Sequence, residues 1–267
     1  MSAKPKLGQN FLCDQQAIQR IVAALGDIGA RTVVEIGPGK GAITQVLAAR
    51  AGKLIAIELD REMAWVLQER FSPEKGFHNV KVCRQDVLAF DFAAAAREAG
   101  QPLLVVGNLP YYITSPILLH LAASAATLDL AVLMVQREVA DRVTAEPGTR
   151  EYGVLTTTLQ LYGSATPLFT LPPEAFVPPP EVHSTVFRWS FAPRFAELGV
   201  DEAGFITFLK QCFAQKRKTL SNNLRAAGVP AGKLVAAFEV AQISALARAE
   251  TLSLAEFAGV YGALGTG

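Results

Sequence analysis

The 267-residue chain has only three cysteines and three histidines. Cys13, Cys83 and Cys212 are far apart in the sequence and show no paired spacing. A disulfide framework needs an even set of cysteines, and a cysteine zinc site needs closely spaced pairs. The sequence therefore predicts neither, and no metal is expected. The histidines are equally scattered and are interpreted as structural or surface residues.

Long hydrophobic runs and an excess of one charge are also missing. The longest apolar runs, such as 130–135, are far shorter than the ~20 residues that cross a bilayer. The N-terminus lacks the charged-then-apolar pattern of a secretory signal. We therefore expect a soluble, cytoplasmic protein. The net charge is +1, so nucleic-acid binding would have to depend on a local basic surface.

Short apolar runs alternate with helical patterns through about residue 164, which predicts βαβ units and a mostly parallel sheet. Two later strands are separated by a proline-rich loop without room for a crossover helix, so we expect them to pair antiparallel at the sheet edge. The predicted fold class is a Rossmann-like α/β sheet, mostly parallel with an antiparallel edge strand. The expected strands are 32–36, 54–57, 80–83, 103–106, 131–135, 168–171 and 182–189.

The pattern changes near residue 190, where Pro193 interrupts it. From Asp201 onward only helical periods appear, as in Phe205, Phe208 and Leu209. We therefore predict an α/β domain over 1–192 and a small all-helical domain over 193–267.

Residues 35–41 form a glycine-rich loop between a predicted strand and a predicted helix, and they read Glu-Ile-Gly-Pro-Gly-Lys-Gly. Glycines let the backbone turn sharply and let a ligand approach closely. Dinucleotides and S-adenosylmethionine both suit such a loop. The spacing is G-x-G-x-G with an acidic first residue, which departs from the dinucleotide pattern G-x-G-x-x-G. A tight turn without a ligand is the alternative.

Two acidic residues follow neighbouring strands. Glu58 ends the second strand, where a carboxylate can accept both hydroxyls of a ribose; a helix cap shared with Asp60 is the alternative. Asp86 follows the third strand and can accept a hydrogen bond from the cofactor's adenine amino group. Its alternative is a turn or N-cap aspartate.

The sharpest signal is the loop 108–112, which reads Asn-Leu-Pro-Tyr-Tyr after the fourth strand. An adenine N6 amino group is a poor nucleophile because its lone pair is delocalised into the ring, and two acceptors at once can orient it. We expect these acceptors to be the Asn108 side-chain oxygen and the Pro110 carbonyl, with Tyr111 as a stacking surface for the base. A proline turn with core aromatics is the alternative.

These motifs resemble those of the ribosomal RNA adenine N6,N6-dimethyltransferases, most closely the bacterial branch that modifies two adjacent adenines near the 3′ end of small-subunit (16S) rRNA. The resemblance runs nearly end to end, and the order of the motifs matches. The stretches that carry it are 7–12, 35–41, 58–60, 85–88, 108–112, 176–184 and 215–224.

The resemblance implies S-adenosylmethionine as cofactor, the small ribosomal subunit as partner, and a role in its biogenesis; we expect a monomer. It implies cofactor contacts from Gln9, Asn10, Leu12, Gly37, Gly39, Glu58, Leu59, Asp86, Val87 and Asn108. It implies that the target base is held by Asn108, Leu109, Pro110 and Tyr111, with Phe176 closing on its other face.

The expected chemistry is direct in-line methyl transfer, in which the enzyme mainly aligns the reactants. The RNA is expected to bind a basic stretch that contains no acidic residue; a solvated helix face is the alternative. This stretch contains Lys210, Lys216, Arg217, Lys218 and Arg225, and Lys4 and Lys6 are further candidates.

Three other functions fit parts of the pattern. The first is a large-subunit adenine methylase, which the loop at 176 and the stretch 215–224 disfavour. The second is an assembly factor that acts mainly by binding. The third is a small-molecule methyltransferase or nicotinamide enzyme, which the glycine spacing and the basic C-terminal stretch disfavour.

Overall fold

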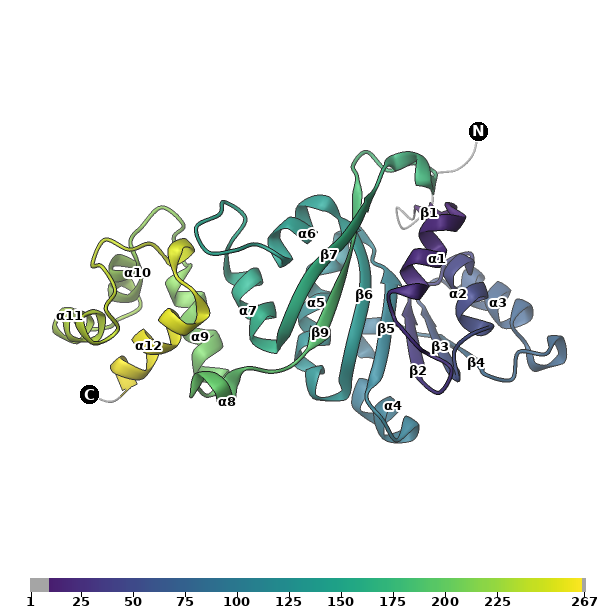
Figure 1. The fold of residues 1–267 in the computed structure, drawn as a ribbon, viewed down its shortest axis with the longest axis horizontal. Coiled ribbons are helices and arrows are strands. Elements are labelled where there is room, and N and C mark those ends of the chain that lie inside the picture. The colour runs from purple at the N-terminus through teal and green to yellow at the C-terminus, as the bar shows by residue number, and fades with distance from the viewer. Residues whose placement is uncertain (1–9, 266–267) are drawn as a thin grey trace. The chain divides into compact units, whose positions relative to one another are not determined.

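The computed structural model describes residues 10–265, so Gln9, Lys4 and Lys6 lie outside the described residues. The chain divides into two compact units (Figure 1). The α/β unit comprises the residues up to Ala140 together with Ser164–Phe191, and the helical unit comprises Asp141–Gly163 and the residues from Ala192 onward.

A seven-stranded sheet in the order β4-β3-β2-β5-β6-β9-β7 forms the centre of the α/β unit. The pairs from β4 to β6 are parallel, and β9 runs antiparallel to β6, with β7 outermost. The predicted fold class is therefore confirmed. The strands are β2 (Thr32–Ile36), β3 (Lys53–Glu58), β4 (Val80–Arg84), β5 (Leu103–Asn108), β6 (Leu128–Gln136), β7 (Gly163–Leu171) and β9 (Ser184–Phe191).

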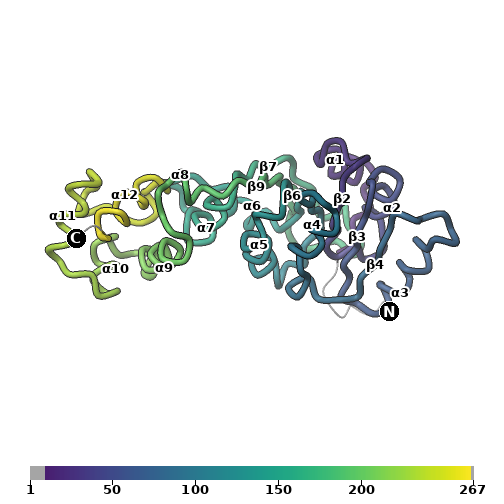
Figure 2. The backbone as a smooth tube through the Cα atoms, turned by 90° about the horizontal axis from the view of Figure 1, so that it is seen from below, coloured from purple at the N-terminus to yellow at the C-terminus, as the bar shows by residue number. Residues whose placement is uncertain are grey.

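Every residue of β2 is buried, which shows that both faces of the sheet are covered. Asp14 caps α1, since its side chain accepts hydrogen bonds from the N–H groups of Gln16 and Ala17. Helices α1 and α2 lie side by side (Figures 1 and 2). The helices are α1 (Gln15–Ala23), α2 (Ala42–Ala48), α3 (Arg61–Arg70), α4 (Phe92–Ala99), α5 (Thr114–Ala123) and α6 (Arg137–Val143).

A separate two-stranded pair joins the N-terminal segment to the proline-rich loop. In it, β1 (Phe11–Leu12) runs antiparallel to β8 (Phe176–Val177), with Leu12 opposite Phe176. Two stretches more than 160 residues apart in sequence are thus tied together through their backbones.

The helical unit is built on aromatic packing around Phe205, Phe208 and Phe257, which are buried. The rings of Phe208 and Phe257 meet edge to face at 6.5 Å between centroids, a favoured aromatic geometry. Its helices are α7 (Val154–Tyr162), α8 (Phe195–Leu198), α9 (Glu202–Cys212), α10 (Leu220–Ala226), α11 (Ala231–Val240) and α12 (Leu254–Gly265).

The division differs from the predicted boundary at 192/193, because Asp141–Gly163 belongs to the helical unit. The Tyr152 ring packs against Phe213 with centroids 6.2 Å apart, and the Tyr162 hydroxyl donates to Glu202 over 2.6 Å. These partners lie 40 or more residues away in sequence, which is why local patterns placed the segment with the preceding strands. No helix in residues 10–265 is long and apolar enough to cross a membrane.

Candidate functional site

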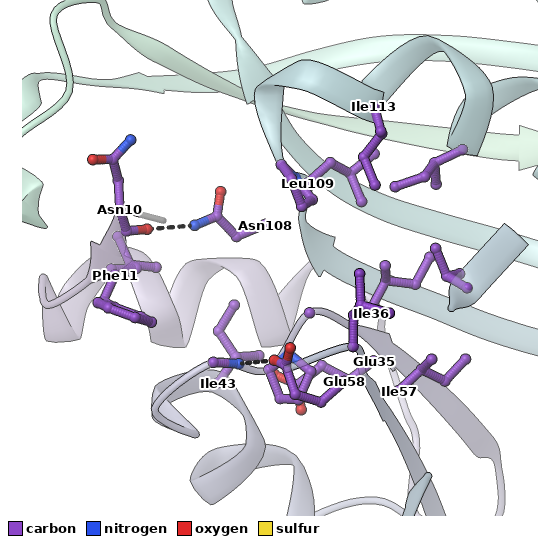
Figure 3. A pocket seen from close by; sticks show the side chains of 18 of the residues that line it. Asn10, Phe11, Glu35, Ile36, Ile43, Ile57, Glu58, Asn108, Leu109 and Ile113 are labelled. Atoms are coloured by element: carbon purple, nitrogen blue, oxygen red, sulfur yellow. Dashed lines mark hydrogen bonds between the residues drawn. The ribbon is translucent and has the colours of Figure 1, made fainter. Parts of the chain in front are cut away.

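A pocket lies at the carboxyl ends of β2, β3, β4 and β5, where ligands bind in open α/β sheets (Figure 3). It encloses about 1050 Å³ including its open mouth. The segment at Asn10–Leu12 completes the wall. The predicted residues that line the pocket are Asn10, Leu12, Gly37, Gly39, Glu58, Leu59, Asp86, Val87, Asn108, Leu109, Pro110 and Tyr111.

Three glycines of the loop have a positive φ, and at two of them a side chain would also collide with a neighbour. Gly39 has φ +54°, and a Cβ there would lie 2.9 Å from the Phe11 ring. Gly41 has φ +78°, and its Cβ would lie 2.9 Å from the Leu67 side chain. Both are left-handed conformations that L side chains rarely adopt. The loop therefore brings its bare backbone into the pocket, closed by a hydrogen bond from Gly41 N to Pro38 O of 2.8 Å.

Glu58 connects β3 to this loop. It is 2% exposed; its Oε2 accepts from Gly39 N over 3.0 Å and its Oε1 from Asp60 N over 2.9 Å. Asp60, not Glu58, caps α3, so the alternative of a shared cap is not what the structure shows. Burial raises the pKa of Glu58. Each carboxylate oxygen has a second lone pair, which remains available to a ribose hydroxyl.

Glu35 also lines the pocket, although sequence reasoning gave it no role beyond opening the loop. It is buried, its Oε2 accepts from Thr44 Oγ1 over 2.7 Å, and burial raises its pKa to about 8. The signal that could have found it is an acidic residue within an otherwise apolar strand, because a buried carboxyl needs a partner.

Asp86 acts as a turn and N-cap residue, as the alternative interpretation proposed, and its contact with the cofactor's adenine remains a prediction. Its Oδ1 accepts from Leu88 N over 2.9 Å and caps a short 3₁₀ turn at Val87–Ala89. Its Oδ2 accepts no hydrogen bond from residues 10–265. One oxygen therefore positions the side chain, and the other remains available at the pocket wall.

Asn108 has a fixed amide orientation. Its Nδ2 donates to the Asn10 carbonyl over 3.0 Å (Figure 3). The side-chain oxygen consequently faces the other way, and no donor among the described residues reaches it. The N-terminal segment thus presents the Asn108 oxygen as a free acceptor.

The carbonyl of Pro110 is not the free acceptor that the sequence analysis expected. It accepts from Ile113 N over 3.2 Å and from Thr114 Oγ1 over 2.9 Å, which engages both of its lone pairs. The Leu109 carbonyl, by contrast, has no donor within residues 10–265, and Leu109 is 1% exposed. Buried carbonyls without a partner are uncommon. Leu109 therefore replaces Pro110 as the candidate second acceptor.

Tyr111 contributes a ring to the pocket wall. Its hydroxyl is 2.8 Å from Ser184 Oγ at the start of β9, and burial raises its pKa. The tyrosine therefore stays neutral at ordinary pH, with its hydroxyl tied to the sheet.

Phe176 does not lie where the resemblance implied. It is 2% exposed, belongs to the hydrophobic core with Leu12 and Ile18, and is absent from the pocket wall. Its neighbour Val177 is 55% exposed instead. Side chains alternate along a strand, so the pairing of β8 with β1 turns Phe176 inward. In this structure it anchors the proline-rich loop.

The predicted basic residues are divided between a turn and the ends of two helices. Lys216, Arg217 and Lys218 are exposed on a turn between α9 and α10, which we call the basic turn (residues 213–219). Arg225 is exposed in the last turn of α10. Lys210 is exposed at the end of α9.

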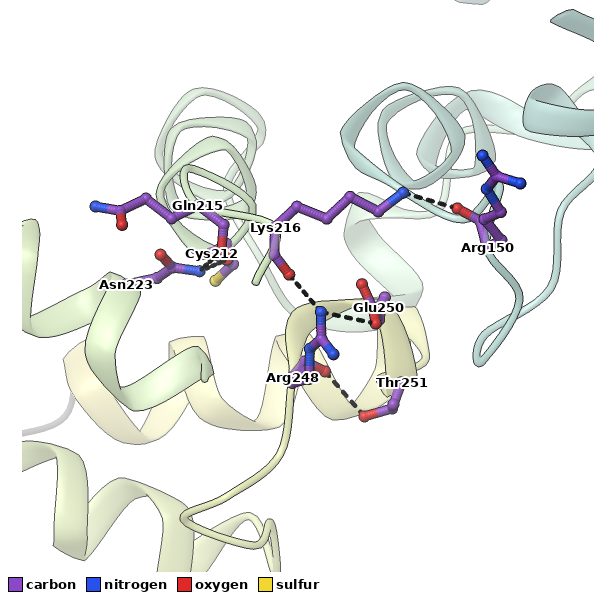
Figure 4. Close-up of polar contacts among 8 residues, drawn as sticks. All are labelled: Arg150, Cys212, Gln215, Lys216, Asn223, Arg248, Glu250 and Thr251. Atoms are coloured by element: carbon purple, nitrogen blue, oxygen red, sulfur yellow. Dashed lines mark hydrogen bonds and ion pairs between the residues drawn. The ribbon is translucent and has the colours of Figure 1, made fainter. Parts of the chain in front are cut away.

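Lys216 is engaged within the helical unit (Figure 4). Its Nζ donates to the Arg150 carbonyl over 3.0 Å, and its own carbonyl accepts from Arg248 over 2.8 Å. Asn223 holds the turn from the other side by donating to the carbonyls of Cys212 and Gln215. Lys216 therefore fixes the shape of the basic turn, which leaves Arg217 and Lys218 as its outward charges.

The sheet order with β9 antiparallel to β6, together with the pocket at the strand ends, defines a Rossmann-like methyltransferase. The model of one family, described as ribosomal RNA adenine dimethylase, matches residues 1–264. The chain belongs to the ribosomal RNA adenine dimethylase family.

Curated relatives with the name ribosomal RNA small subunit methyltransferase A are similar over almost the whole chain. The protein from Acidobacterium capsulatum is 58% identical over 97% of this chain and 90% of its own length. The one from Koribacter versatilis is 48% identical over 99% and 95%.

Solved structures agree on the fold. A dimethyladenosine transferase from Plasmodium falciparum gives a TM-score of 0.81 at 24% identity, covering 94% of this chain and 95% of that one. The 23S rRNA methyltransferase ErmE gives 0.74 at 24% identity, covering 96% and 100%. Both structures are 24% identical to this chain, so they show the fold that it shares with them.

Proposed function

We propose that this protein transfers methyl groups from S-adenosylmethionine to N6 of two adjacent adenines near the 3′ end of 16S rRNA, giving N6,N6-dimethyladenosine during small-subunit biogenesis. The observation that carries the site assignment is the Asn108 amide, whose orientation is fixed by Asn10 and whose oxygen is free. The relatives named for the small subunit support the choice of substrate.

The pocket suits S-adenosylmethionine. It is lined mostly by apolar side chains with a few polar groups among them, as small-ligand sites usually are. The bare backbone at Gly39 leaves room for the ligand, Glu58 offers lone pairs to the ribose, and the free Asp86 oxygen suits an adenine amino group. Leu59 and Val87 provide apolar contact in the wall.

When bound, S-adenosylmethionine would supply a methyl group on a positively charged sulfur: the N–C bond to the amine forms as the S–C bond breaks, and the sulfur leaves as a neutral thioether. The chain's own part is to orient that nitrogen. In the first transfer, the Asn108 oxygen and the Leu109 carbonyl would each accept one N6 hydrogen, and this would orient the nitrogen for attack. Alignment of this kind supplies ~7–11 kcal/mol in well-oriented reactions.

Stacking of the base and loss of the N6 proton complete the proposed mechanism. The Tyr111 ring gives a flat surface for the extruded base. Asn108 and Leu109 need no change of charge, so the proton that leaves N6 after transfer passes to water. Room for one N6-methyl group is required for the second round.

The basic turn would hold the rRNA backbone through Arg217 and Lys218, with Arg225 alongside on α10. Both turn residues are exposed, and the turn contains no acidic side chain. The electrostatic attraction to phosphates is independent of sequence and falls with salt. We place the protein in the cytoplasm as a monomer that binds the immature small subunit.

The substrate assignment is tested by labelled methyl transfer to unmodified small subunits and, in parallel, to large subunits, followed by nucleoside analysis. We expect N6,N6-dimethyladenosine in the small subunit alone. Label confined to the large subunit would identify a large-subunit adenine methylase instead. Label in neither subunit would contradict the assignment to ribosomal subunits.

A further inference from the structure

Two buried hydroxyl groups hold the loop between β5 and α5. Thr114 is 2% exposed, and its Oγ1 donates to the Pro110 carbonyl four residues earlier, over 2.9 Å. Ser184 is 0% exposed, and its Oγ lies 2.8 Å from the Tyr111 hydroxyl. One hydroxyl therefore fixes the backbone of the loop, and the other fixes its aromatic ring.

The Thr114 bond bears on the direction of the Leu109 carbonyl. The Leu109–Pro110 peptide has no N–H, because proline lacks one, so no hydrogen bond can anchor that peptide plane from the nitrogen side. The plane is set by its neighbours: Leu109 N donates to Met134 O over 2.9 Å, and Pro110, with φ −60°, is tied through its own carbonyl to Thr114.

Helix stability does not explain the Thr114 hydroxyl. The N-cap residue of α5 is Ile113, which makes no side-chain capping bond. A threonine that bonds back to the carbonyl at i−4 slightly destabilises a helix. The hydroxyl is thus better explained by the carbonyl that it holds than by the helix that it begins.

We propose that Thr114 and Ser184 are positioning residues for methyl transfer. Thr114 sets the Leu109 carbonyl relative to the Asn108 oxygen, and Ser184 sets the Tyr111 ring. Neither needs to touch the substrate. The inference depends on the roles proposed above for Asn108, Leu109 and Tyr111.

The main test is Thr114→Val, which keeps the shape of the side chain and removes the hydroxyl. We expect kcat to fall about 10- to 100-fold, the range that small misplacements produce. The KM for the small subunit and the affinity for S-adenosylmethionine should stay within about twofold, since the expected loss belongs to the transition state alone. Thr114→Ser, which retains the hydroxyl, should restore kcat.

Thr157 provides a matched control. It is buried at the start of α7, and its Oγ1 donates to the Gly153 carbonyl four residues earlier, over 3.1 Å. Thr157→Val removes the same kind of bond outside the pocket wall, so kcat should remain within about twofold of wild type. Should Thr114→Val fail to fold, Thr114→Ala and Thr114→Ser make the same comparison.

Ser184 is tested with Tyr111 in a double-mutant cycle. Ser184→Ala and Tyr111→Phe remove opposite ends of one hydrogen bond, so we expect the double variant to lose no more kcat than the worse single variant. Thr185→Val is the matched control, because Thr185 points to the other face of β9 and pairs with Thr170 over 3.0 Å.

Wild-type kcat in both Thr114→Val and Ser184→Ala would overturn the inference, as would an equal loss in Thr157→Val or a failure of Thr114→Ser to restore the rate. Measuring Asn108→Ala in the same assay distinguishes failure of the positioning role from failure of the proposed site. If Asn108→Ala is inactive and the hydroxyl variants are normal, the positioning role alone fails. If Asn108→Ala is fully active, the proposed site itself fails.

Discussion

The pocket and the basic turn hold their polar groups in opposite ways. In the pocket, Asn108 and Glu58 are fixed by backbone partners and largely withdrawn from solvent. On the basic turn, Arg217 and Lys218 are exposed on long flexible side chains, although Lys216 and Asn223 fix the backbone beneath them. Fixed groups suit the alignment of one reaction, whereas flexible charges suit phosphates, which are read without exact geometry.

The largest effect is expected from Asn108→Ala. It removes an acceptor that the structure presents with a single orientation, so we expect kcat to fall by about 10²–10³-fold, as for other preorganised polar groups. Affinity for S-adenosylmethionine, measured by titration, should change far less. A rate within threefold of wild type would show that the amide does not orient N6.

Gly39→Val should come next. It forces a β-branched residue to φ +54° and places a Cβ 2.9 Å from the Phe11 ring, a combination that costs about 1–3 kcal/mol in strain. We expect cofactor affinity to fall roughly 10- to 100-fold by calorimetry. Gly76→Val is the control for strain, because Gly76 also has a positive φ but nothing within 4 Å of its Cβ; equal losses in both variants would contradict a specific role for Gly39.

The basic turn should show a smaller effect with a different signature. Replacing Arg217 and Lys218 together by alanine should weaken binding to the small subunit about tenfold and lower the salt slope by about 0.7–0.9 for each lost phosphate contact. Lys216→Met should leave the slope nearly unchanged, because its ammonium is held by the Arg150 carbonyl. A full loss of slope in Lys216→Met would make Lys216 a direct phosphate contact.

The last prediction concerns stability and its dependence on pH, not rate or affinity. Burial raises the pKa of Glu35 from 4.5 to about 8, so the folded protein retains a proton that the unfolded chain releases. The stabilisation from this group is complete below about pH 4.5 and is lost as the pH rises through about 8, with a slope of about 1.4 kcal/mol per pH unit for one proton. Glu35→Gln should flatten the free energy of unfolding between pH 5 and 8 in denaturant titrations. An unchanged slope would mean that Glu35 is ionised when buried.

Features set by local sequence patterns could be predicted, whereas features set by contacts between distant residues could not. The strands and the glycine loop follow from local patterns, because a run such as Thr32–Ile36 is apolar enough to be buried on both faces. The occupied Pro110 carbonyl, the inward Phe176 and the engaged Lys216 all depend on contacts that local patterns do not encode. Phe176 turns inward because its strand pairs with residues 11–12, far away in sequence, and Lys216 is held by Arg150, 66 residues earlier.

In the helical unit, contacts between distant residues decide the placement of a whole segment. Asp141–Gly163 has the local pattern of one more helix in an α/β series, yet Tyr152 and Tyr162 find their partners on and beside α9. Only the folded chain brings these aromatic residues together.

The most direct test of the division between pocket and turn measures two quantities on the same two variants. One quantity is the single-turnover rate of methyl transfer at saturating small subunit, and the other is the salt slope of subunit binding. We predict that Asn108→Ala loses the rate and keeps the slope, and that the Arg217→Ala, Lys218→Ala double variant keeps the rate and loses slope. If both variants lose the same quantity, catalysis and RNA binding are not divided between these two regions.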